Sequence, residues 1–186
     1  MPNHVRTVVK FKRLKGELDK EFILRMIAKE LTPRDDMFTP DHPDHIIDFN
    51  KVIPQPREEE DCPPEYLRPE ASHAEPLEDR PWFNWYKWNC ERWGTKWGAY
   101  DGYTIQGKTY LTFVFSTAWS LATPIVERLR LLGYDFDVYY ADEDWGCNCG
   151  KIIYNAKDSE WTHEYEEELG DRKARTSYAK RIWDRY

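Results

Sequence analysis

Hydrophobic and polar residues alternate with the period of a β-strand near the start of the chain. Residues 4–11, H-V-R-T-V-V-K-F, are rich in valine and predict a first strand. After Gly16, residues 17–31 change to a helical period and carry acidic residues in their first turn, which favours a helix N-terminus. Pro33 is expected to end this helix. The apolar positions at helical spacing are Leu18, Phe22, Met26 and either Leu24 or Ile27.

The next hydrophobic stretch, residues 46–54, predicts a second strand after a polar loop over residues 34–45. Pro54 and Pro56 close this strand, because proline cannot donate a hydrogen bond to a central β-ladder. Residues 55–81 then hold six of the twelve prolines, many charges and few core-forming side chains. This composition predicts an insertion that is either draped over the domain or partly disordered.

Tryptophan is concentrated in one short segment. Residues 82–97, W-F-N-W-Y-K-W-N-C-E-R-W-G-T-K-W, hold five of the nine tryptophans. Asp79 and Pro81 predict the cap and first turn of a helix, and Gly94 predicts its end. The indoles do not fit on one helical stripe, and each can bury about 150–250 Å². The segment therefore either packs between two layers or presents an aromatic platform to a partner, and the sequence leaves both possibilities open.

The second half of the chain alternates most strongly over residues 109–116, T-Y-L-T-F-V-F-S. With residues 99–105 this stretch predicts a hairpin, whose turn we place at Gln106-Gly107. A threonine–proline pair begins, and a glycine ends, a core helix predicted over residues 123–134. The remaining predictions are strands at 136–141 and 149–155, joined by an acidic turn, and a mainly helical, amphipathic segment at 160–185.

These elements define a fold class. Without the insertion, their order is β-α-β-β-α-β, the split pattern of ferredoxin-like folds. We predict an α+β fold with an antiparallel sheet and helices on one face, plus a Trp-rich extra helix, an extra hairpin strand and a C-terminal helix. The predicted division is a ferredoxin-like domain over residues 1–155, with its Pro-rich acidic insertion at 55–81, and a C-terminal helical extension over 156–186.

Charge is unevenly spread along the chain. Residues 171–186 hold six basic residues against two acidic ones, a balance of +4, so the rest carries −11 within a net charge of −7. An acidic surface repels phosphates, so direct nucleic-acid binding is not expected. Such a surface is either a solvated face with the basic segment folded against it or a docking surface for a basic host protein. The acidic positions proposed to contact a partner are Glu58, Glu59, Glu60, Asp61, Asp142, Glu143 and Asp144.

The chain carries no membrane signal. No run approaches the ~20 apolar residues that span a bilayer, and the N-terminus M-P-N-H-V-R has no apolar leader. We therefore expect a cytoplasmic protein with no membrane partner.

Catalytic signatures are also absent from the sequence. There is no nucleophile elbow, no glycine-rich phosphate loop and no H-E-x-x-H pair, since His163-Glu164 lacks a second histidine. The cysteines are Cys62, Cys90, Cys147 and Cys149. Only one close pair exists, and its C-x-C spacing differs from that of zinc knuckles. The histidines considered for completing a zinc site are His42, His45 and His73. We expect free thiols, no metal, no cofactor and no enzyme.

Aromatic and polar residues around the W-G-T-K-W turn form the candidate site. Aromatic faces stack bases, and Lys96 is placed to meet a phosphate. The alternative is that the tryptophans cover the sheet while Lys96 lies along an indole. A separate possibility, RNA binding on an open sheet face, requires exposed Tyr110, Phe113 or Phe115. The site residues are Asn50, Lys51, Asn89, Trp93, Thr95, Lys96, Trp97, Asp101 and Trp119.

Four motifs carry a resemblance to a known family: N-H-V near the start, D-F-N-K-V-I-P at 48–54, N-C-E-R-W-G-T-K-W-G-A-Y-D at 89–101 and F-S-T-A-W-S at 115–120. Over residues 1–155 the chain resembles the YubB ferredoxin-like family of phage- and plasmid-encoded proteins. The resemblance implies a ferredoxin-like topology without an iron–sulfur cluster and an origin on a mobile element. It implies no reaction.

Three functional hypotheses follow. The first is a non-catalytic accessory protein that binds a host protein or protein–nucleic acid complex and inhibits an antiviral defence system such as a CRISPR effector. Acidic inhibitors can occupy basic nucleic-acid channels by electrostatic complementarity. The alternative is a protein that binds a nucleotide or nucleotide-derived signal in a pocket of Trp93, Lys96, Trp97 and Trp119. The third is a structural subunit that self-associates.

Overall fold

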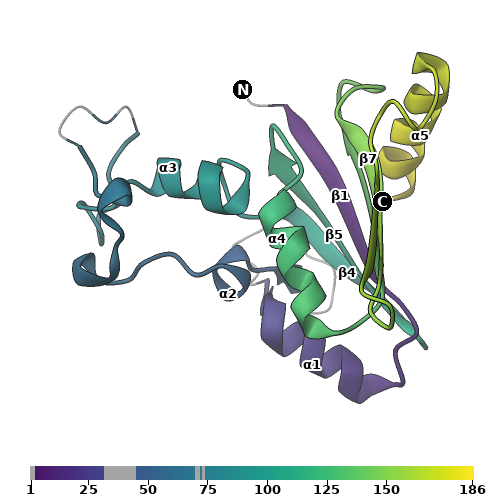
Figure 1. Ribbon diagram of the computed structural model, residues 1–186, viewed down its shortest axis with the longest axis horizontal. Helices are drawn as coiled ribbons and strands as arrows, with labels where there is room; N and C mark the ends of the chain where they lie inside the picture. The colour runs from purple at the N-terminus through teal and green to yellow at the C-terminus, as the bar shows by residue number, and fades with distance from the viewer. Residues whose placement is uncertain (1–2, 32–44, 70–71, 73) are drawn as a thin grey trace.

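The computed structural model describes residues 3–31, 45–69, 72 and 74–186, and it is organised around one six-stranded antiparallel sheet (Figure 1). The strand order is β4-β5-β1-β6-β7-β8. Central β1 pairs along its length with β5 on one side and β6 on the other, so that Val8 lies opposite both Val114 and Tyr139. The strands are β1 (His4–Phe11), β4 (Tyr100–Gly107), β5 (Tyr110–Ala118), β6 (Phe136–Asp142), β7 (Cys149–Asn155) and β8 (Glu160–Glu164).

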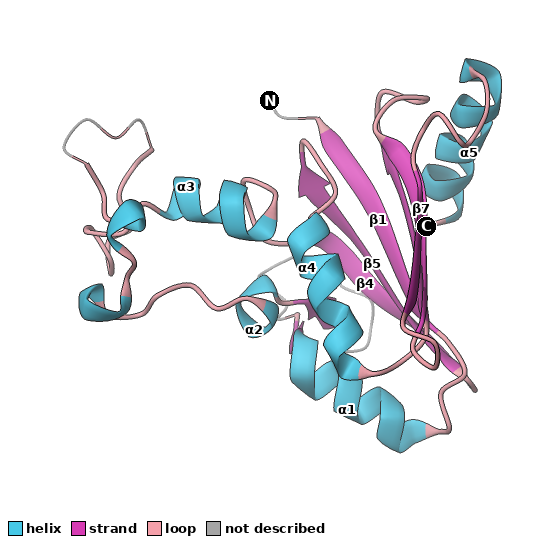
Figure 2. Ribbon diagram, viewed as in Figure 1, coloured by secondary structure: helices cyan, strands magenta, loops and turns pink. Residues whose placement is uncertain are grey.

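Helices cover both faces of this sheet (Figure 2). On one face lie α1 (Glu17–Ile27) and α4 (Thr123–Arg128), which a 3₁₀ turn (Leu129–Leu132) extends. Alternate residues of β1 and β5 point toward them into the main core, among them Val9 and Phe113. The opposite face, which includes Val8 and Val114, is partly covered by α5 (Arg172–Arg185) through Ala179 and Ile182. None of the helices in the described part of the chain has the length and apolar character needed to cross a membrane.

The sheet order confirms the predicted ferredoxin-like α+β fold. Strands β4, β5, β1 and β6 with helices α1 and α4 form two interlocked split β-α-β units, because β5 lies between β1 and β4 and β1 lies between β5 and β6. The second strand of this pattern is β4 and not residues 46–54. Strands β7 and β8 extend the sheet beyond β6.

Residues 46–54 were wrongly predicted as one strand. Strand β3 (His45–Ile47) is short, and it pairs with β2 (Ala28–Glu30) in a separate two-stranded ribbon. Helix α2 (Phe49–Val52) follows at once, because the Asp48 carboxylate accepts a hydrogen bond from the Asn50 amide and caps it. The loop predicted at 34–45 lies outside the described residues except for His45.

The predicted helix at 17–31 is shorter and turned differently. It ends at Ile27, where the chain enters β2. Ile27, one of the two predicted alternatives, faces the core together with Ile23. Leu18 and Met26 are 82% and 45% exposed, so the predicted stripe is wrong at these two positions. Lys20 is also buried, and its Nζ lies 2.7 Å from Glu17 Oε1.

The Pro-rich segment is not draped over the sheet. It extends away from it, at the left of Figure 1, and packs around its own small core. Hydrogen bonds join the start and the end of the segment, including one of 2.9 Å from Arg80 Nη1 to the Pro56 carbonyl. We call residues 54–69, 72 and 74–88 the side lobe. It contains two 3₁₀ turns (Glu59–Asp61 and Pro64–Tyr66), and its buried residues are Cys62, Tyr66, Phe83 and Trp88.

Residues 160–185 were predicted as mainly helical, but the first five form β8. Trp161 and His163 alternate onto the face of β7 and β6: Trp161 packs against Phe136, and His163 Nε2 lies 3.0 Å from the Tyr140 hydroxyl. Because these two rings pack inward at alternate positions, the segment forms a strand, although its sequence pattern is that of an amphipathic helix. The hairpin turn also differs, since β4 includes Gln106-Gly107 and the turn is at residues 108–109.

A candidate docking surface on the Trp-rich segment

The Trp-rich segment is a helix whose last turn is widened. Helix α3 (Trp85–Trp88) begins after Asn84, whose side chain caps it, and not at Pro81 as predicted. A π-helical turn (Asn89–Trp93) continues it and ends at Gly94, which has a left-handed φ of 78°. A Cβ on Gly94 would lie 2.8 Å from Pro124 Cδ, so glycine is required both for the turn and for the contact with α4.

This turn separates core tryptophans from exposed ones. Trp93 is buried against Phe49, and its Nε1 donates a hydrogen bond of 2.9 Å to the Ile53 carbonyl. Trp88 is buried in the side lobe. Trp97, beyond Gly94, is 38% exposed. The segment therefore contributes tryptophans both to the core and to the surface, and Trp93 lies on the core side, away from the exposed Trp97.

Two buried polar side chains fix the chain on either side of this turn. Thr95 Oγ1 donates to the Ala118 carbonyl at 2.7 Å and accepts from the Ala118 amide at 3.1 Å. Asn89 Nδ2 donates to the Lys96 carbonyl at 2.8 Å, and Asn89 Oδ1 accepts from Gln55 Nε2 at 2.7 Å. Both side chains are buried, so their hydrogen bonds hold the backbone of Lys96 against the end of β5 and are not open to a ligand.

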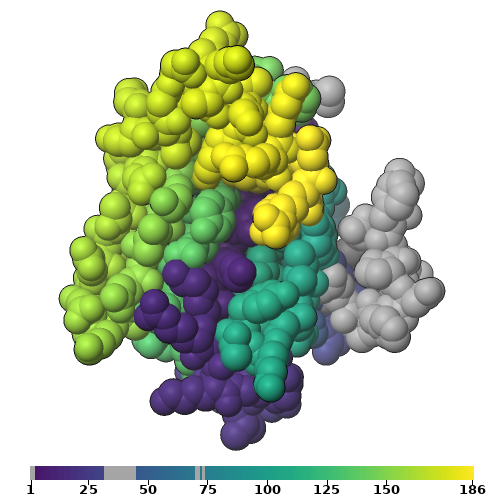
Figure 3. Space-filling view, turned by 90° about the vertical axis from the view of Figure 1, so that its right-hand side faces the viewer, coloured from purple at the N-terminus to yellow at the C-terminus, as the bar shows by residue number. Residues whose placement is uncertain are grey.

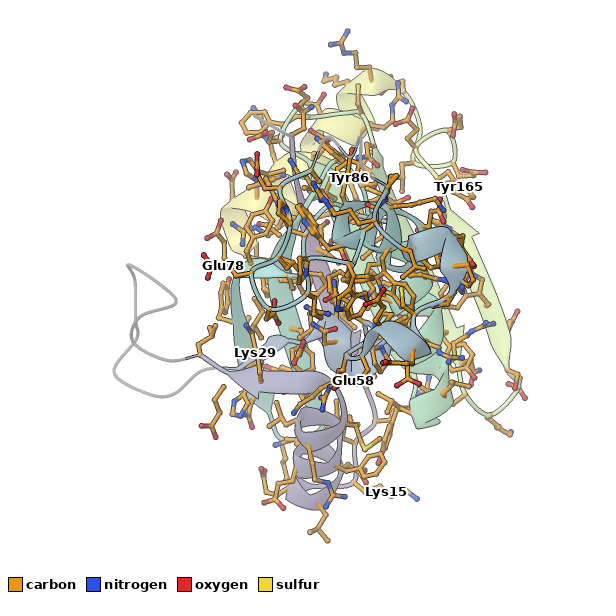
Figure 4. All side chains as sticks on the ribbon, turned by 90° about the vertical axis from the view of Figure 1, so that its left-hand side faces the viewer. Lys15, Lys29, Glu58, Glu78, Tyr86 and Tyr165 are labelled. Carbon is orange, nitrogen blue, oxygen red and sulfur yellow. The ribbon has the colours of Figure 1, made fainter. Side chains whose placement is uncertain are left out.

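Four side chains converge on the outer side of the turn that Thr95 and Asn89 hold in place. The ammonium of Lys96 lies 4.7 Å from the ring centroid of Trp97, 5.6 Å from that of Trp119 and 5.9 Å from that of Tyr86. The Tyr86 and Trp119 rings meet edge to face at 6.4 Å. We call Tyr86, Lys96, Trp97 and Trp119 the aromatic surface; Figure 4 labels Tyr86 on the side of the molecule that carries it. All three rings are more than one third exposed.

Backbone contacts hold Trp119 in an unusual conformation. Its φ is 72°, a left-handed value that is uncommon outside glycine. Its amide donates to the Asn3 carbonyl at 2.9 Å, and its carbonyl accepts from Asn148 Nδ2 at 2.8 Å. The Ser120 hydroxyl donates to the Gly94 carbonyl at 2.6 Å. The backbone of this residue is thus tied to two separate segments, and its neighbour Ser120 to a third, which supports the left-handed conformation.

A shallow hollow adjoins the aromatic surface at Trp97. It has a volume of about 480 Å³ and also includes His4, Lys29 and Tyr100. His4 Nδ1 and the Tyr100 hydroxyl are 2.6 Å apart, and burial raises the pKa of Tyr100 to about 12. The phenol therefore stays protonated at neutral pH and serves as a hydrogen-bonding group.

The other predicted site residues have local roles elsewhere. Asn50 Oδ1 accepts from the Gln55 amide at 3.0 Å. Lys51 Nζ donates to the Ala28 carbonyl at 2.5 Å and secures the end of α1. Asp101 has a φ of 45°, and its carbonyl accepts from Arg6 Nη1 at 3.0 Å. None of these three side chains belongs to the aromatic surface.

Tyr86 is the member of the aromatic surface that the sequence analysis missed. On a helix it points about 100° away from Trp85, whereas Trp88 returns toward the side that Trp85 occupies. Trp85 and Trp88 pack in the side lobe, which leaves Tyr86 on the outer side beside Trp119. The helical spacing of the W-Y-K-W run carried this signal, but no property of the sequence identified Trp119 as its neighbour.

The predicted acidic surface is divided. The run Glu58–Asp61 is exposed on the side lobe, and Figure 4 labels Glu58 there. Asp142 was wrongly predicted as a partner contact: it is buried, and it accepts hydrogen bonds from the Asp144 amide at 2.9 Å and from Asn148 Nδ2 at 3.3 Å. Glu143 and Asp144 are exposed, but their carboxylates accept hydrogen bonds from the His4 amide and the Asn3 side chain.

Two of the three aromatic residues that RNA stacking on the sheet would require do not lie on an open face. Phe113 and Phe115 are fully buried in the core beneath α1 and α4, and Lys10 lies over the Tyr110 ring at 4.7 Å. The two phenylalanines take the inward positions of β5 because the helices pack on that face.

The cysteines are dispersed. Cys62 is buried in the side lobe and Cys149 beneath α5, and burial raises the pKa of Cys149 to about 11. Desolvation also raises the pKa of Cys90. Over residues 3–31, 45–69, 72 and 74–186, no three His, Cys, Asp or Glu side chains are grouped to hold a metal ion. His42 and His73 lie outside those residues.

Comparison with known proteins supports the fold. A family model described as the ferredoxin-like domain in Api92-like protein matches residues 92–184, half of the chain. Searches among curated proteins and solved structures found no match. The matched residues run from the turn that carries Lys96 and Trp97, through β4–β8, to the end of α5. The chain therefore belongs to the family of ferredoxin-like domains found in Api92-like proteins.

Proposed function

We propose that this chain is a non-catalytic accessory protein that docks on a host macromolecule through the aromatic surface. The observation that carries the proposal is the set of three exposed rings around Lys96, fixed from beneath by Thr95 and Asn89. Tryptophan and tyrosine dominate the energetics of protein interfaces, and they are most effective on a rigid support. Exposed aromatic groups of this kind mark interaction sites on soluble proteins.

Two of the thiols are poorly suited to nucleophilic chemistry. A thiol reacts as its thiolate, and burial that raises the pKa of Cys90 and Cys149 keeps both thiols neutral at pH 7. Desolvation has the largest effect on the pKa of Cys90, and a hydrogen bond with Tyr86 and the charge of Lys96 lower that pKa by less.

We further propose that the protein comes from a phage or another mobile element and inhibits a component of bacterial antiviral defence, such as a CRISPR effector, in the bacterial cytoplasm. The resemblance of W-G-T-K-W and T-A-W-S to the YubB family supports the origin. The exposed Glu58–Asp61 run on the side lobe supports a partner with a basic channel, because four adjacent carboxylates complement such a channel in charge.

Charge reversal of the side lobe tests this proposal. The tagged protein is used to capture a partner from bacterial lysate, and the affinity of the purified pair is then measured from 50 to 300 mM salt. Changing Glu58, Glu59, Glu60 and Asp61 to lysine is expected to weaken binding at least tenfold at low salt and to flatten its salt dependence, because the favourable charge pairs are lost.

The matched control reverses four exposed acids away from the lobe and produces the same change in net charge. These are Glu21, Glu127, Asp158 and Glu160. An equal loss of affinity in both variants would show that net charge, and not the position of these acids, causes the effect. An unchanged affinity in the lobe variant would exclude the lobe as a contact.

A further inference from the structure

A basic hollow lies along α5, on a part of the molecule that the proposed docking function does not use. Its volume is about 580 Å³. Five residues of one helical face line it: Arg172, Lys173, Thr176, Ser177 and Lys180. The hydroxyl of Thr176 donates to the Arg172 carbonyl at 2.7 Å, and the other four side chains carry hydrogen-bond donors. The turn between β6 and β7 packs closely beside it, because a Cβ on Gly146 would lie 3.0 Å from Thr176 Oγ1. Figure 3 shows α5, in yellow, on the surface of this face.

The cations of this hollow are available to a ligand. Arg172, Lys173 and Lys180 are exposed, and none of them forms an ion pair with a residue that the structure describes. Arg175, on the side of the helix toward the sheet, instead pairs with Glu166 at 3.5 Å. The lining residues carry a charge of +3. The carboxylate of Asp171, which precedes them, accepts a hydrogen bond from the Ala174 amide and caps the helix.

An exposed tryptophan stands beside these cations. Trp145, in the turn between β6 and β7, is 42% exposed, and Lys180 Nζ lies 4.7 Å from the centroid of its ring. Nearby carboxylates are Glu143 and Asp144 in the same turn and Asp184 one turn along α5. Of these, Glu143 and Asp144 accept hydrogen bonds from the His4 amide and the Asn3 side chain. The ring and the cations together provide a stacking platform beside phosphate-binding groups.

We propose that this hollow binds a single strand of nucleic acid, with phosphates on Arg172, Lys173 and Lys180 and one base stacked on Trp145. Proteins that hold single strands combine a basic groove with aromatic platforms in this way. An acidic peptide would satisfy the cations, but it has no base to stack on the indole.

The acidic character of the whole chain does not oppose this binding. The side lobe and α5 lie at opposite ends of the molecule in Figure 1. At physiological ionic strength, charges interact over about 8 Å, so the carboxylates of the lobe are screened from the hollow. The attraction therefore depends on the charges near the hollow, where residues 171–186 carry +4 and the preceding run Glu166–Glu168 carries −3, more than on the net charge of −7.

The test measures fluorescence anisotropy of a labelled deoxythymidine 12-mer with the full chain at 50, 100 and 200 mM salt. Three phosphate contacts predict that log K falls with log salt at a slope of about −2. The Lys173→Glu and Lys180→Glu variants are expected to flatten this slope. Trp145→Ala is expected to weaken binding about tenfold through loss of stacking, and Trp145→Phe to retain part of it.

Lys157→Glu is the control, since this exposed lysine lies in the turn after β7 and its charge change is the same. Thermal unfolding of each variant confirms that it folds. Absence of binding at 50 mM salt, or an equal loss in Lys157→Glu, would overturn the proposal. So would binding to phosphatidylserine vesicles or to a polyglutamate peptide without binding to the 12-mer.

Discussion

Replacing Thr95 with valine is expected to lower the free energy of unfolding by about 2–4 kcal/mol, the largest stability effect that we predict for a near-isosteric change. The Thr95 hydroxyl makes two hydrogen bonds to Ala118, and both groups are fully buried. Valine removes both bonds and leaves the Ala118 groups without these partners in a dry interior. Urea unfolding of the two proteins measures the difference.

Thr95→Ser is the matched control for this prediction. It keeps the hydroxyl and removes one methyl group, which is expected to cost about 1 kcal/mol. Should the valine variant prove as stable as the serine variant, packing of the methyl would be the dominant contribution of Thr95, and the hydrogen-bonded support of the aromatic surface would lose its basis.

Removing the indoles of the aromatic surface is expected to abolish partner capture without unfolding the protein. Hot-spot aromatic residues contribute about 2 kcal/mol each on truncation, so Trp97→Ala and Trp119→Ala should each weaken binding about 30-fold. Both rings are substantially exposed, and the core contains neither of them. Titration calorimetry with the purified partner measures the loss, and circular dichroism confirms the fold.

Tyr165→Ala provides the comparison for these variants. This ring is 53% exposed and lies after β8, where it stacks on His163. It has the size and exposure of a contact residue but lies outside the aromatic surface. Equal losses for Tyr165→Ala and Trp119→Ala would indicate a general effect of surface aromatic residues and would count against the assigned surface.

The sheet could be predicted from the sequence because its strands obey a local rule. In β1 and β5, alternate residues face two differently covered sides, and this period of two is visible in V-R-T-V-V-K-F and in Y-L-T-F-V-F-S. The same rule failed at residues 46–54, where a strand of three residues passes directly into a capped helix. It failed again at 160–164, where many charges obscured the inward positions of Trp161 and His163.

The candidate site was only partly predictable, because helical spacing shows which residues share a face and not what covers that face. Trp93 and Trp97 looked equivalent in the sequence. The left-handed turn at Gly94 sends one into the core and leaves the other exposed. The proximity of Trp119 to Tyr86 depends on the pairing of β5 with β1 and on the bonds that fix residue 119, which are contacts between distant segments.

Hydroxyl-radical footprinting of the complex tests the central claim most directly, because it reports the solvent exposure of individual side chains. The complex formed with the purified partner is compared with the free protein, and Tyr165 serves as an internal reference. We predict that oxidation of Tyr86, Trp97 and Trp119 slows at least severalfold on binding, while that of Tyr165 is unchanged. If Trp97 and Trp119 were oxidised as fast in the complex as in the free protein, the aromatic surface would not be the docking site.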